Sequence, residues 1–383
     1  MTPVPVNTSV LRWALERSGR DPATLSKKLP SLPEWLEGRR HPTLRQLEIF
    51  ARATSTPLGY LFLAEPPDER LPIPHFRTVS DRGPRRPSPE LLDTVHTMQR
   101  RQAWMREHLI DEGHEPLRFV RSAGRANEPP ILAEEIRKSL GLDHNWAAQE
   151  STWTNALTKL RERIEAALIL VVVNGIVGNN THRKLDPEEF RGFVLVDEYA
   201  PLVFVNGADS KAAQMFTLAH ELSHLWLGSS AAFDLRELQP ADDDTERACN
   251  RIAAELLVPE HQLRGAWRAA RPAPNRYQLL AREFKVSELV AARRLLDLAL
   301  IRRSEFHDFY QAYLQAERKA AKESSGGDFY ATQNLRIGRR FAEVVVRATR
   351  EDKLLYRDAY QLTGLYGRSF EHYAESLAFG GAG

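Results

Sequence analysis

The chain of 383 residues is long enough for about two to four domains, and its hydrophobic content of 42% with 27% charged residues is that of a folded globular protein. It contains no run of roughly 18 apolar residues that could span a membrane, and residues 1–9 do not resemble a secretory signal, so we expect a cytoplasmic protein with no membrane partner. The net charge of +2 does not indicate a nucleic-acid partner. The single cysteine, Cys249, excludes an internal disulfide and a cysteine-rich zinc site, so a metal site must use His and carboxylate ligands.

The first 64 residues are predicted to form a compact helical module. Apolar residues at helical spacing, with glycine and proline between the segments, predict helices at residues 10–18, 23–29 and 44–54. Prolines then recur between residues 65 and 89, where they disfavour regular hydrogen-bonded structure and favour extended chain, so we place a domain boundary there. Further helices are predicted at residues 90–112, 130–140 and 152–166.

The hydrophobic pattern changes in the middle of the chain. Three segments rich in branched and aromatic residues predict strands at residues 167–177, 190–196 and 202–206. Two helices follow at residues 210–227 and 245–257, ended by Gly228 and Pro259. Beyond residue 274 the pattern is helical again, with a linker at residues 324–327.

These elements predict an α+β protein that is mostly helical, with a small three-stranded sheet in its central domain. The predicted parts are a helical module, a linker with a helical region, the central domain, a helical segment packed on it and a helical tail. They cover residues 1–64, 65–150, 151–265, 266–323 and 324–383.

The predicted helix at residues 210–227 carries two histidines four residues apart, in the stretch HELSH. Residues four apart lie on one face of a helix, so His220 and His224 can offer imidazole nitrogens to one metal ion. The surrounding leucines indicate a buried helix, and a buried imidazole or carboxylate needs a partner, which a divalent cation supplies. Glu221 lies beside both histidines and can take a proton from a water molecule that zinc activates at neutral pH.

Catalytic zinc usually has three protein ligands, and the helix at residues 245–257 offers two carboxylates for the third position. Glu246 shares a helix face with Asn250, so we favour Glu246 as the ligand and Asn250 as the residue that orients one imidazole. Glu255 is the alternative ligand. Cys249 is predicted to be a buried thiol in the core. The group that polarises the substrate carbonyl besides zinc is left open among His182, Tyr199 and His261.

Residues 216–259 resemble the ImmA/IrrE family of bacterial metallopeptidases. The matching residues are His220, Glu221, His224, Glu246 and Asn250, followed by residues 253–259, and the segments 190–193 and 200–206 resemble the strands before the active helix of that family. The resemblance implies a zincin-like, gluzincin-type endopeptidase with Zn2+ held by the two histidines and Glu246, and with Glu221 as general base. It also implies a protein substrate of the repressor or antitoxin type, because family members cleave such regulators or act in phage, stress and toxin–antitoxin circuits.

The amino-terminal module resembles an XRE-type helix-turn-helix domain at residues 25–29 and 35–44. The segment between these residues is about five residues too short for a full recognition helix, which needs two to three turns to lie along a DNA major groove. The DNA-binding interpretation uses basic residues for contacts with DNA or phosphate, namely Lys27, Lys28, Arg39, Arg40 and Arg45. The alternative is a retained helical fold that packs on the peptidase or on a partner, with these residues as a solvated face.

The tail at residues 327–377 resembles that of family members encoded beside PIN-like toxins, and its arginines are typical of a solvated helix face. We therefore weigh two functions. The first is a zinc-dependent endopeptidase that cleaves a regulatory protein of the repressor or antitoxin type. The second is an antitoxin or transcriptional regulator that binds a neighbouring toxin or DNA, and whose metal is structural or regulatory.

Overall fold

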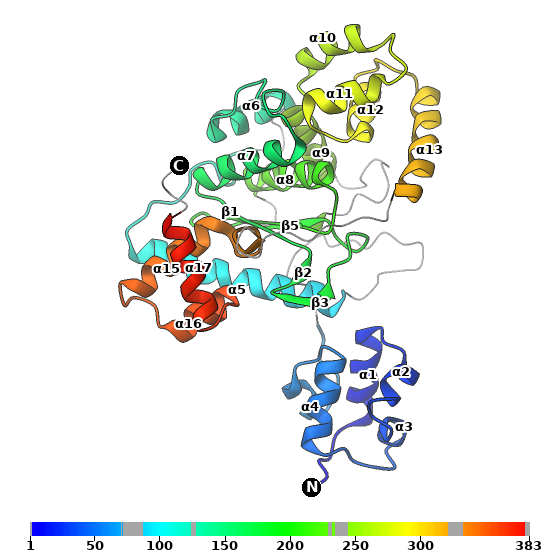
Figure 1. The fold of residues 1–383 in the computed structure, drawn as a ribbon, viewed down its shortest axis with the longest axis vertical. Helices are drawn as coiled ribbons and strands as arrows, with labels where there is room; N and C mark the ends of the chain where they lie inside the picture. The colour runs from blue at the N-terminus through cyan, green and yellow to red at the C-terminus, as the bar shows by residue number, and fades with distance from the viewer. Residues whose placement is uncertain are drawn as a thin grey trace. The chain divides into compact units, whose positions relative to one another are not determined.

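The computed structural model describes residues 2–69, 71, 87–123, 128–228, 232–233, 244–320 and 332–379. Over these residues the chain is mostly helical with a small central sheet, as predicted (Figure 1). Its contacts divide the chain into two compact units, residues 1–72 with 80–96 and residues 73–79 with 97–383. None of the helices in the described part of the chain is long and apolar enough to cross a membrane. The predicted linker at residues 324–327 lies outside the described residues, as does much of the proline-rich stretch.

The first unit contains a helical module with a core of its own. Its elements are α1 (Thr8–Ser18), α2 (Pro22–Ser26), α3 (Leu32–Leu36), α4 (Leu44–Ala53) and the 3-10 helix η1 (Leu58–Phe62). The second helix ends earlier than predicted, at Ser26, with Lys27 as its carboxyl-terminal cap. Pro30 disfavours helical backbone at Leu29, where the predicted helix would have ended. Apolar side chains from all five elements face inward, and the buried ones include Val10, Leu11, Leu25, Leu32, Trp35, Leu47, Phe50 and Leu61.

Three helices precede the sheet, close to their predicted bounds. They are α5 (Pro89–Asp111), α6 (Pro129–Leu140) and α7 (Trp153–Ala166). From Thr97 onward α5 belongs to the second unit. The start of α7 follows from its cap, because the Thr152 side chain accepts a hydrogen bond from the backbone N–H of Asn155 at 3.1 Å.

The central sheet has four strands in the order β1-β5-β4-β6. The strands are β1 (Leu170–Asn174), β4 (Gly192–Leu195), β5 (Leu202–Asn206) and β6 (Ala232–Phe233). β1 pairs parallel with β5, and the other pairs are antiparallel. The three predicted strands are present, but β6 is too short to leave a periodic pattern in the sequence.

A two-stranded hairpin, β2 (Ile176–Val177) and β3 (Asn180–Lys184), follows β1. The prediction was wrong in extending the first strand to residue 177, because the chain turns away at Gly175. A Cβ atom at Gly175 would lie only 2.8 Å from the backbone nitrogen of Ala208, so this close approach admits glycine alone. The hairpin escaped prediction because β3 is polar and mostly exposed.

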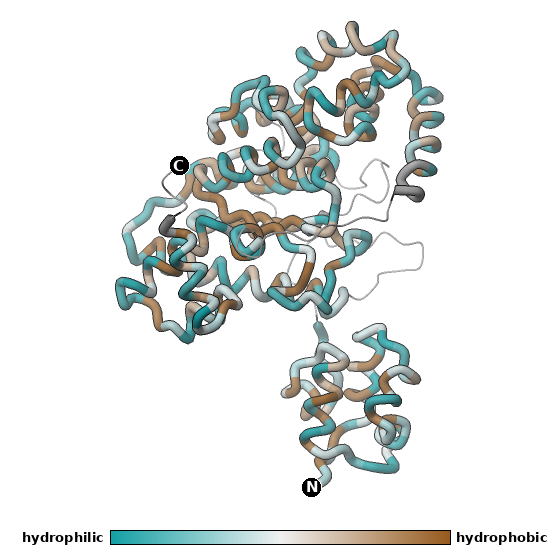
Figure 2. Tube along the Cα trace, in the orientation of Figure 1, coloured by the Kyte–Doolittle hydropathy of each residue, from teal (hydrophilic) through white to brown (hydrophobic). Residues whose placement is uncertain are grey.

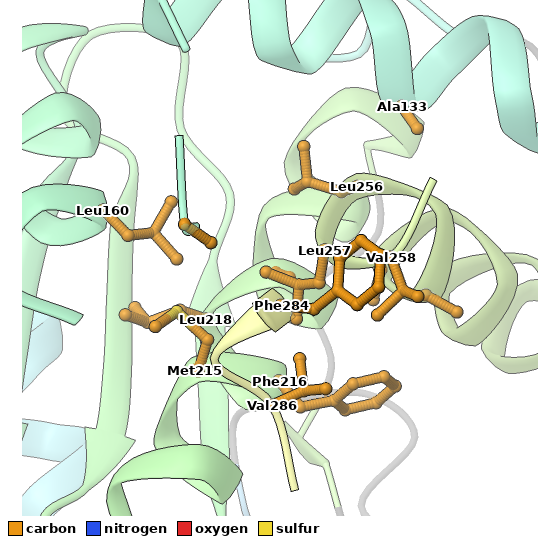
Figure 3. Packing of buried hydrophobic residues seen from close by; sticks show 14 of the residues in the cluster. Ala133, Leu160, Met215, Phe216, Leu218, Leu256, Leu257, Val258, Phe284 and Val286 are labelled. Carbon is orange, nitrogen blue, oxygen red and sulfur yellow. The ribbon is translucent and has the colours of Figure 1, made fainter. Parts of the chain in front are cut away.

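One long helix packs directly on the sheet and carries the candidate site. This is α8 (Lys211–Leu227), which lies against both β4 and β5, with α7 and α9 (Asp244–Leu257) as its helical neighbours. The strands of the sheet form a hydrophobic band through the middle of the second unit (Figure 2). Figure 3 shows Met215 and Leu218 of α8 in the same core as Leu257 of α9.

The helices after α9 pack one upon the next. They are α10 (Glu260–Ala270), α11 (Arg276–Phe284), α12 (Glu288–Asp297) and α13 (Arg303–Ala320). Phe284 of this group reaches the same core as α8 and α9 (Figure 3). The packing therefore joins these helices to the sheet domain.

The first two carboxyl-terminal helices lie against the outer strand β1, and the last two pack on the second of them. They are η2 (Asn334–Gly338), α15 (Arg339–Arg350), α16 (Tyr356–Thr363) and α17 (Arg368–Phe379). The buried Arg101 of α5 ties them together, because its guanidinium donates to the carbonyl oxygens of Leu362 at 2.9 Å and Arg336 at 3.0 Å. Burial lowers the pKa of Arg101 to about 10.

We expect Gly338→Ala to destabilise the second unit. Gly338 has a φ of 88°, and a Cβ atom there would lie 2.7 Å from the carbonyl oxygen of Val171 in β1. The strained backbone alone costs about 1–3 kcal/mol. Urea unfolding measures this change, with Gly265→Ala as the control, because Gly265 lies within α10 and has open space around it. Equal stability of the two variants would contradict the contact between η2 and β1.

Candidate metal centre

The helix α8 is built to hold polar groups inside an apolar core. The Ser210 side chain caps its start by accepting from the backbone N–H of Ala213, and Gly228, with a φ of 76°, ends it in the left-handed conformation. Between these caps His220, Glu221 and His224 are all fully buried. Because a buried ionisable group without a partner is unfavourable, the three side chains require compensation from a neighbouring element.

That element is α9, whose first turn places Glu246 against both histidines. The Nε2 atoms of His220 and His224 lie 3.0 Å apart, and the Glu246 carboxylate reaches them at 3.2 Å and 3.3 Å. In the described part of the chain, these three residues form the one group of at least three His, Cys, Asp or Glu residues that could hold a metal ion. The structure thus brings together the two histidines and Glu246.

The spacing of these atoms fits a tetrahedral metal ion. Ligand atoms about 2.0–2.1 Å from a tetrahedral zinc ion lie about 3.3 Å from one another. The three separations of 3.0 to 3.3 Å are close to this value. Two imidazole nitrogens and one carboxylate are also a donor set that zinc prefers.

Asn250, one turn along α9 from Glu246, orients the first ligand. The Nδ1 atom of His220 lies 3.0 Å from the Oδ1 atom of Asn250. An amide oxygen can only accept, so Nδ1 of His220 carries the proton and Nε2 presents its lone pair to the cluster. This is the arrangement by which protein metal sites fix the tautomer of a histidine ligand.

The electrostatics of the cluster follow from burial and charge. Burial would raise the pKa of Glu246, but the adjacent imidazoles of His220 and His224 outweigh burial and hold that pKa well below its usual range. Burial lowers the pKa of His220, so this imidazole is neutral at pH 7 and able to bind a metal. A neutral imidazole and an ionised carboxylate are the ligand forms that a divalent cation requires.

Glu221 lies on the same helix but makes a different set of contacts. Both of its carboxylate oxygens are buried, and neither has a hydrogen-bond partner among the described residues. Burial raises its pKa well above the ordinary value, and the charge of Glu246 raises it further. A carboxyl group held in this way can accept and return a proton, provided that a polar reactant enters the space beside it.

Gly192 at the start of β4 determines how closely Glu221 approaches the sheet. A Cβ atom at Gly192 would lie 2.5 Å from Cγ2 of Thr217, 2.8 Å from the carbonyl oxygen of Phe204 and 3.5 Å from Oε1 of Glu221. The absent side chain therefore lets α8 settle against β4 with the carboxylate of Glu221 at the strand. Neither Gly192 nor Thr217 was assigned a role from the sequence, because their proximity arises only from packing between helix and sheet.

The alternative ligand Glu255 belongs to another network. It is buried on α9, where its carboxylate pairs with Arg294 of α12 and accepts from the backbone N–H of Glu260 at 3.2 Å. Its carbonyl oxygen accepts from Arg137 of α6. Glu255 therefore joins three helices and caps the start of α10, and it is not part of the three-residue metal group. Charge pairing over a distance of 39 residues left no signal in the sequence.

Other predicted residues lie in separate surroundings. Cys249 is fully buried on α9. His182 is exposed on β3. Arg106 covers the ring of Tyr199 at 5.5 Å, and the exposed ring of His261 packs edge-on against His144 at 5.3 Å. These contacts connect none of the three proposed electrophiles to the metal cluster.

The five basic residues of the amino-terminal unit are all exposed, at Lys27, Lys28, Arg39, Arg40 and Arg45. Arg39 pairs with Glu37, and Arg40 lies 3.5 Å from Glu34. Both partners lie in or directly after α3, which is five residues long. Acidic side chains thus neutralise part of the surface that a recognition helix would present to DNA.

Two parts of the chain match known family models. Residues 176–296 match the IrrE N-terminal-like domain (Peptidase_M78), and residues 337–376 match a domain of unknown function (DUF8813). The first match contains the whole metal cluster and supports the ImmA/IrrE resemblance over this part of the chain. Neither match covers the amino-terminal helices, and no curated protein matches the chain. The fold and the site together define an α+β peptidase-like domain with a candidate metal centre, flanked by helical regions. Over residues 176–296 this domain is similar to the IrrE N-terminal-like domain.

We expect Asn250→Ala to weaken divalent-metal binding about 10–100-fold, because His220 loses the acceptor that fixes its tautomer. Competition with a chromophoric chelator measures the affinity. Asn155→Ala is the matched control, because Asn155 lies exposed on α7 and has no contact with the cluster. Unchanged affinity in Asn250→Ala would show that the hydrogen bond does not orient the ligand.

Proposed function

We propose that this protein is a zinc-dependent endopeptidase that cleaves a regulatory protein. The observation that carries the proposal is the convergence of His220, His224 and Glu246 at tetrahedral spacing beside the buried, unpartnered carboxylate of Glu221. A purely structural metal site has a closed ligand shell with no bound water. A carboxylate beside such a site would have no water molecule from which to accept a proton. The match to a peptidase domain supports the same conclusion.

Each residue of the site has a distinct role in the proposed amide hydrolysis. Zinc, when bound by His220, His224 and Glu246, supplies an activated water and polarises the scissile carbonyl. Glu221 takes a proton from the attacking water and delivers it to the leaving amide nitrogen. The raised pKa of Glu221 favours holding that proton between the two steps, and a cation at the ligands offsets the charge of Glu246 so that the carboxylate form is also accessible.

The proposed substrate is a repressor- or antitoxin-type regulator, or a partner encoded with it. This part of the proposal is supported by the ImmA/IrrE resemblance and by the domain match at residues 176–296.

We expect about one zinc per chain in protein purified without chelators. His220→Ala and Glu246→Ala should lose this zinc, because each removes one of three ligands. Glu221→Gln should keep the zinc and the fold but lose proteolysis, since an amide cannot accept the proton. Elemental analysis and cleavage of proteins captured by Glu221→Gln measure the two properties separately.

Two outcomes would contradict the proposal. If wild-type protein contains no stoichiometric metal, the proposed metal centre is wrong. A biological effect that survives Glu221→Gln assigns the protein to binding rather than cleavage, as an antitoxin or regulator that holds a toxin. Glu371→Gln is the matched control, because Glu371 is exposed on α17 and its loss should leave zinc content and cleavage unchanged.

We further propose that the amino-terminal module binds protein rather than a DNA sequence. The short α3 and the pairing of Arg39 and Arg40 with acidic neighbours support this reading. Lys27, Lys28 and Arg45 are then free to make phosphate contacts that carry no sequence information.

We expect weak DNA binding without sequence preference. The affinity should fall steeply with salt, and the triple variant Lys27→Ala, Lys28→Ala, Arg45→Ala should lower the slope of log K against log salt by roughly three, about one per lost phosphate contact. Salt-titrated fluorescence anisotropy with specific and scrambled duplexes makes the measurement. A preference of more than a hundredfold (~10²) for one sequence would contradict this expectation and show that the module recognises a specific DNA sequence.

A further inference from the structure

A hollow lies among the helices that follow the metal cluster, and none of its lining residues belongs to that cluster. Its volume is about 390 Å3, near the lower end of the roughly 300–1,000 Å3 found for small-ligand clefts. The first turns of α11, α12 and α13 form its walls. Aromatic and acidic side chains line it together, namely Tyr277, Phe309, Glu288, Glu305 and Asp308.

The chain's own Arg276 shows which chemistry this hollow accommodates. Its Nη2 atom donates to the carboxylate of Glu305 at 2.8 Å, and its guanidinium carbon lies 5.2 Å over the ring of Tyr277. The Tyr277 hydroxyl donates to the same carboxylate at 3.2 Å. Planar cations thus pack on an aromatic face here while their N–H groups reach an acid.

The aromatic wall is held firmly in place. Tyr277 is 8% exposed, and its ring contacts Phe309 at 4.4 Å and Trp267 at 6.4 Å between centroids. Side chains fixed by such packing lose little conformational entropy when a ligand binds. The wall is therefore preorganised.

The charges of the hollow remain unbalanced after this internal pair is formed. Arg276 neutralises Glu305, whereas Glu288 and Asp308 form no ion pair within the part of the chain that the structure describes. Three carboxylates against one guanidinium leave two negative charges. A cation is the ligand that such a lining favours.

We propose that the hollow binds an arginine side chain of another polypeptide. Its guanidinium packs on the ring of Phe309, and its N–H groups donate to Glu288 and Asp308. Arginine suits the site better than lysine, because its planar fork matches carboxylates and stacks on rings as Arg276 does. This proposal concerns binding alone and holds whether or not the metal centre hydrolyses peptides.

Saturation-transfer NMR on the full chain tests the proposal with the peptides Ac-Gly-Arg-Gly-NH2 and Ac-Gly-norleucine-Gly-NH2. We expect the arginine peptide to bind and the norleucine peptide not to bind. Glu288→Gln with Asp308→Asn should weaken arginine binding about tenfold or more, since both charge-assisted acceptors are lost. Phe309→Leu should weaken it several-fold by removing the ring while keeping an apolar wall.

The control is Glu107→Gln with Asp111→Asn, which removes the same charge from exposed positions on α5 and should leave binding unchanged. Thermal unfolding verifies that each variant folds. Equal binding of the norleucine peptide, or arginine binding within about twofold of wild type in the Glu288 and Asp308 variant, would overturn the proposal. Tighter binding of free spermidine than of the arginine peptide would overturn the assignment to a polypeptide.

Discussion

The second unit depends on one physical constraint, the burial of two imidazoles and a carboxylate on α8. His220, Glu221 and His224 are removed from water at a site where an uncompensated charge is costly. α8 therefore cannot be an ordinary core helix. The elements around it must place a carboxylate beside the imidazoles and a hydrogen-bond acceptor beside one ring. They must also let α8 pack closely enough on the sheet to fix the position of the Glu221 side chain.

Each neighbouring element meets one of these requirements. β4 allows α8 to pack closely on the sheet, because Gly192 has no side chain to hold α8 away. α9 supplies both Glu246 and Asn250, four residues apart on one face. The position of α9 in turn depends on Glu255, which is buried between Arg294 of α12 and Arg137 of α6. Helices far along the chain thus act on the metal site through the position of α9.

The same packing protects the edges of the sheet. η2 lies beside β1 at one edge, and β6 pairs with β4 at the other. Exposed strand edges invite pairing with other chains, so both sides of this small sheet are covered by segments of its own chain. The carboxyl-terminal helices therefore contribute to the integrity of the peptidase-like domain, in addition to any surface that they present.

The sequence by itself determined the parts of this protein that depend on local pattern. The α+β class, the strands β1, β4 and β5 and the helices around them follow from hydrophobic periodicity and from capping residues such as Ser210 and Gly228. The spacing of His220 and His224 in one helix predicts a shared face for the same reason, since that relation is set by helix geometry alone.

Tertiary structure decided what depends on distance in space. It brought Glu246 to the histidines, while Glu255, equally acidic and on the same helix, went to Arg294. It ended β1 at Asn174, added the hairpin and β6, and placed Gly192 against Thr217. These outcomes lie beyond sequence reasoning because a carboxylate's partner and a glycine's neighbour are chosen by packing between elements far apart in the chain, which no local pattern records.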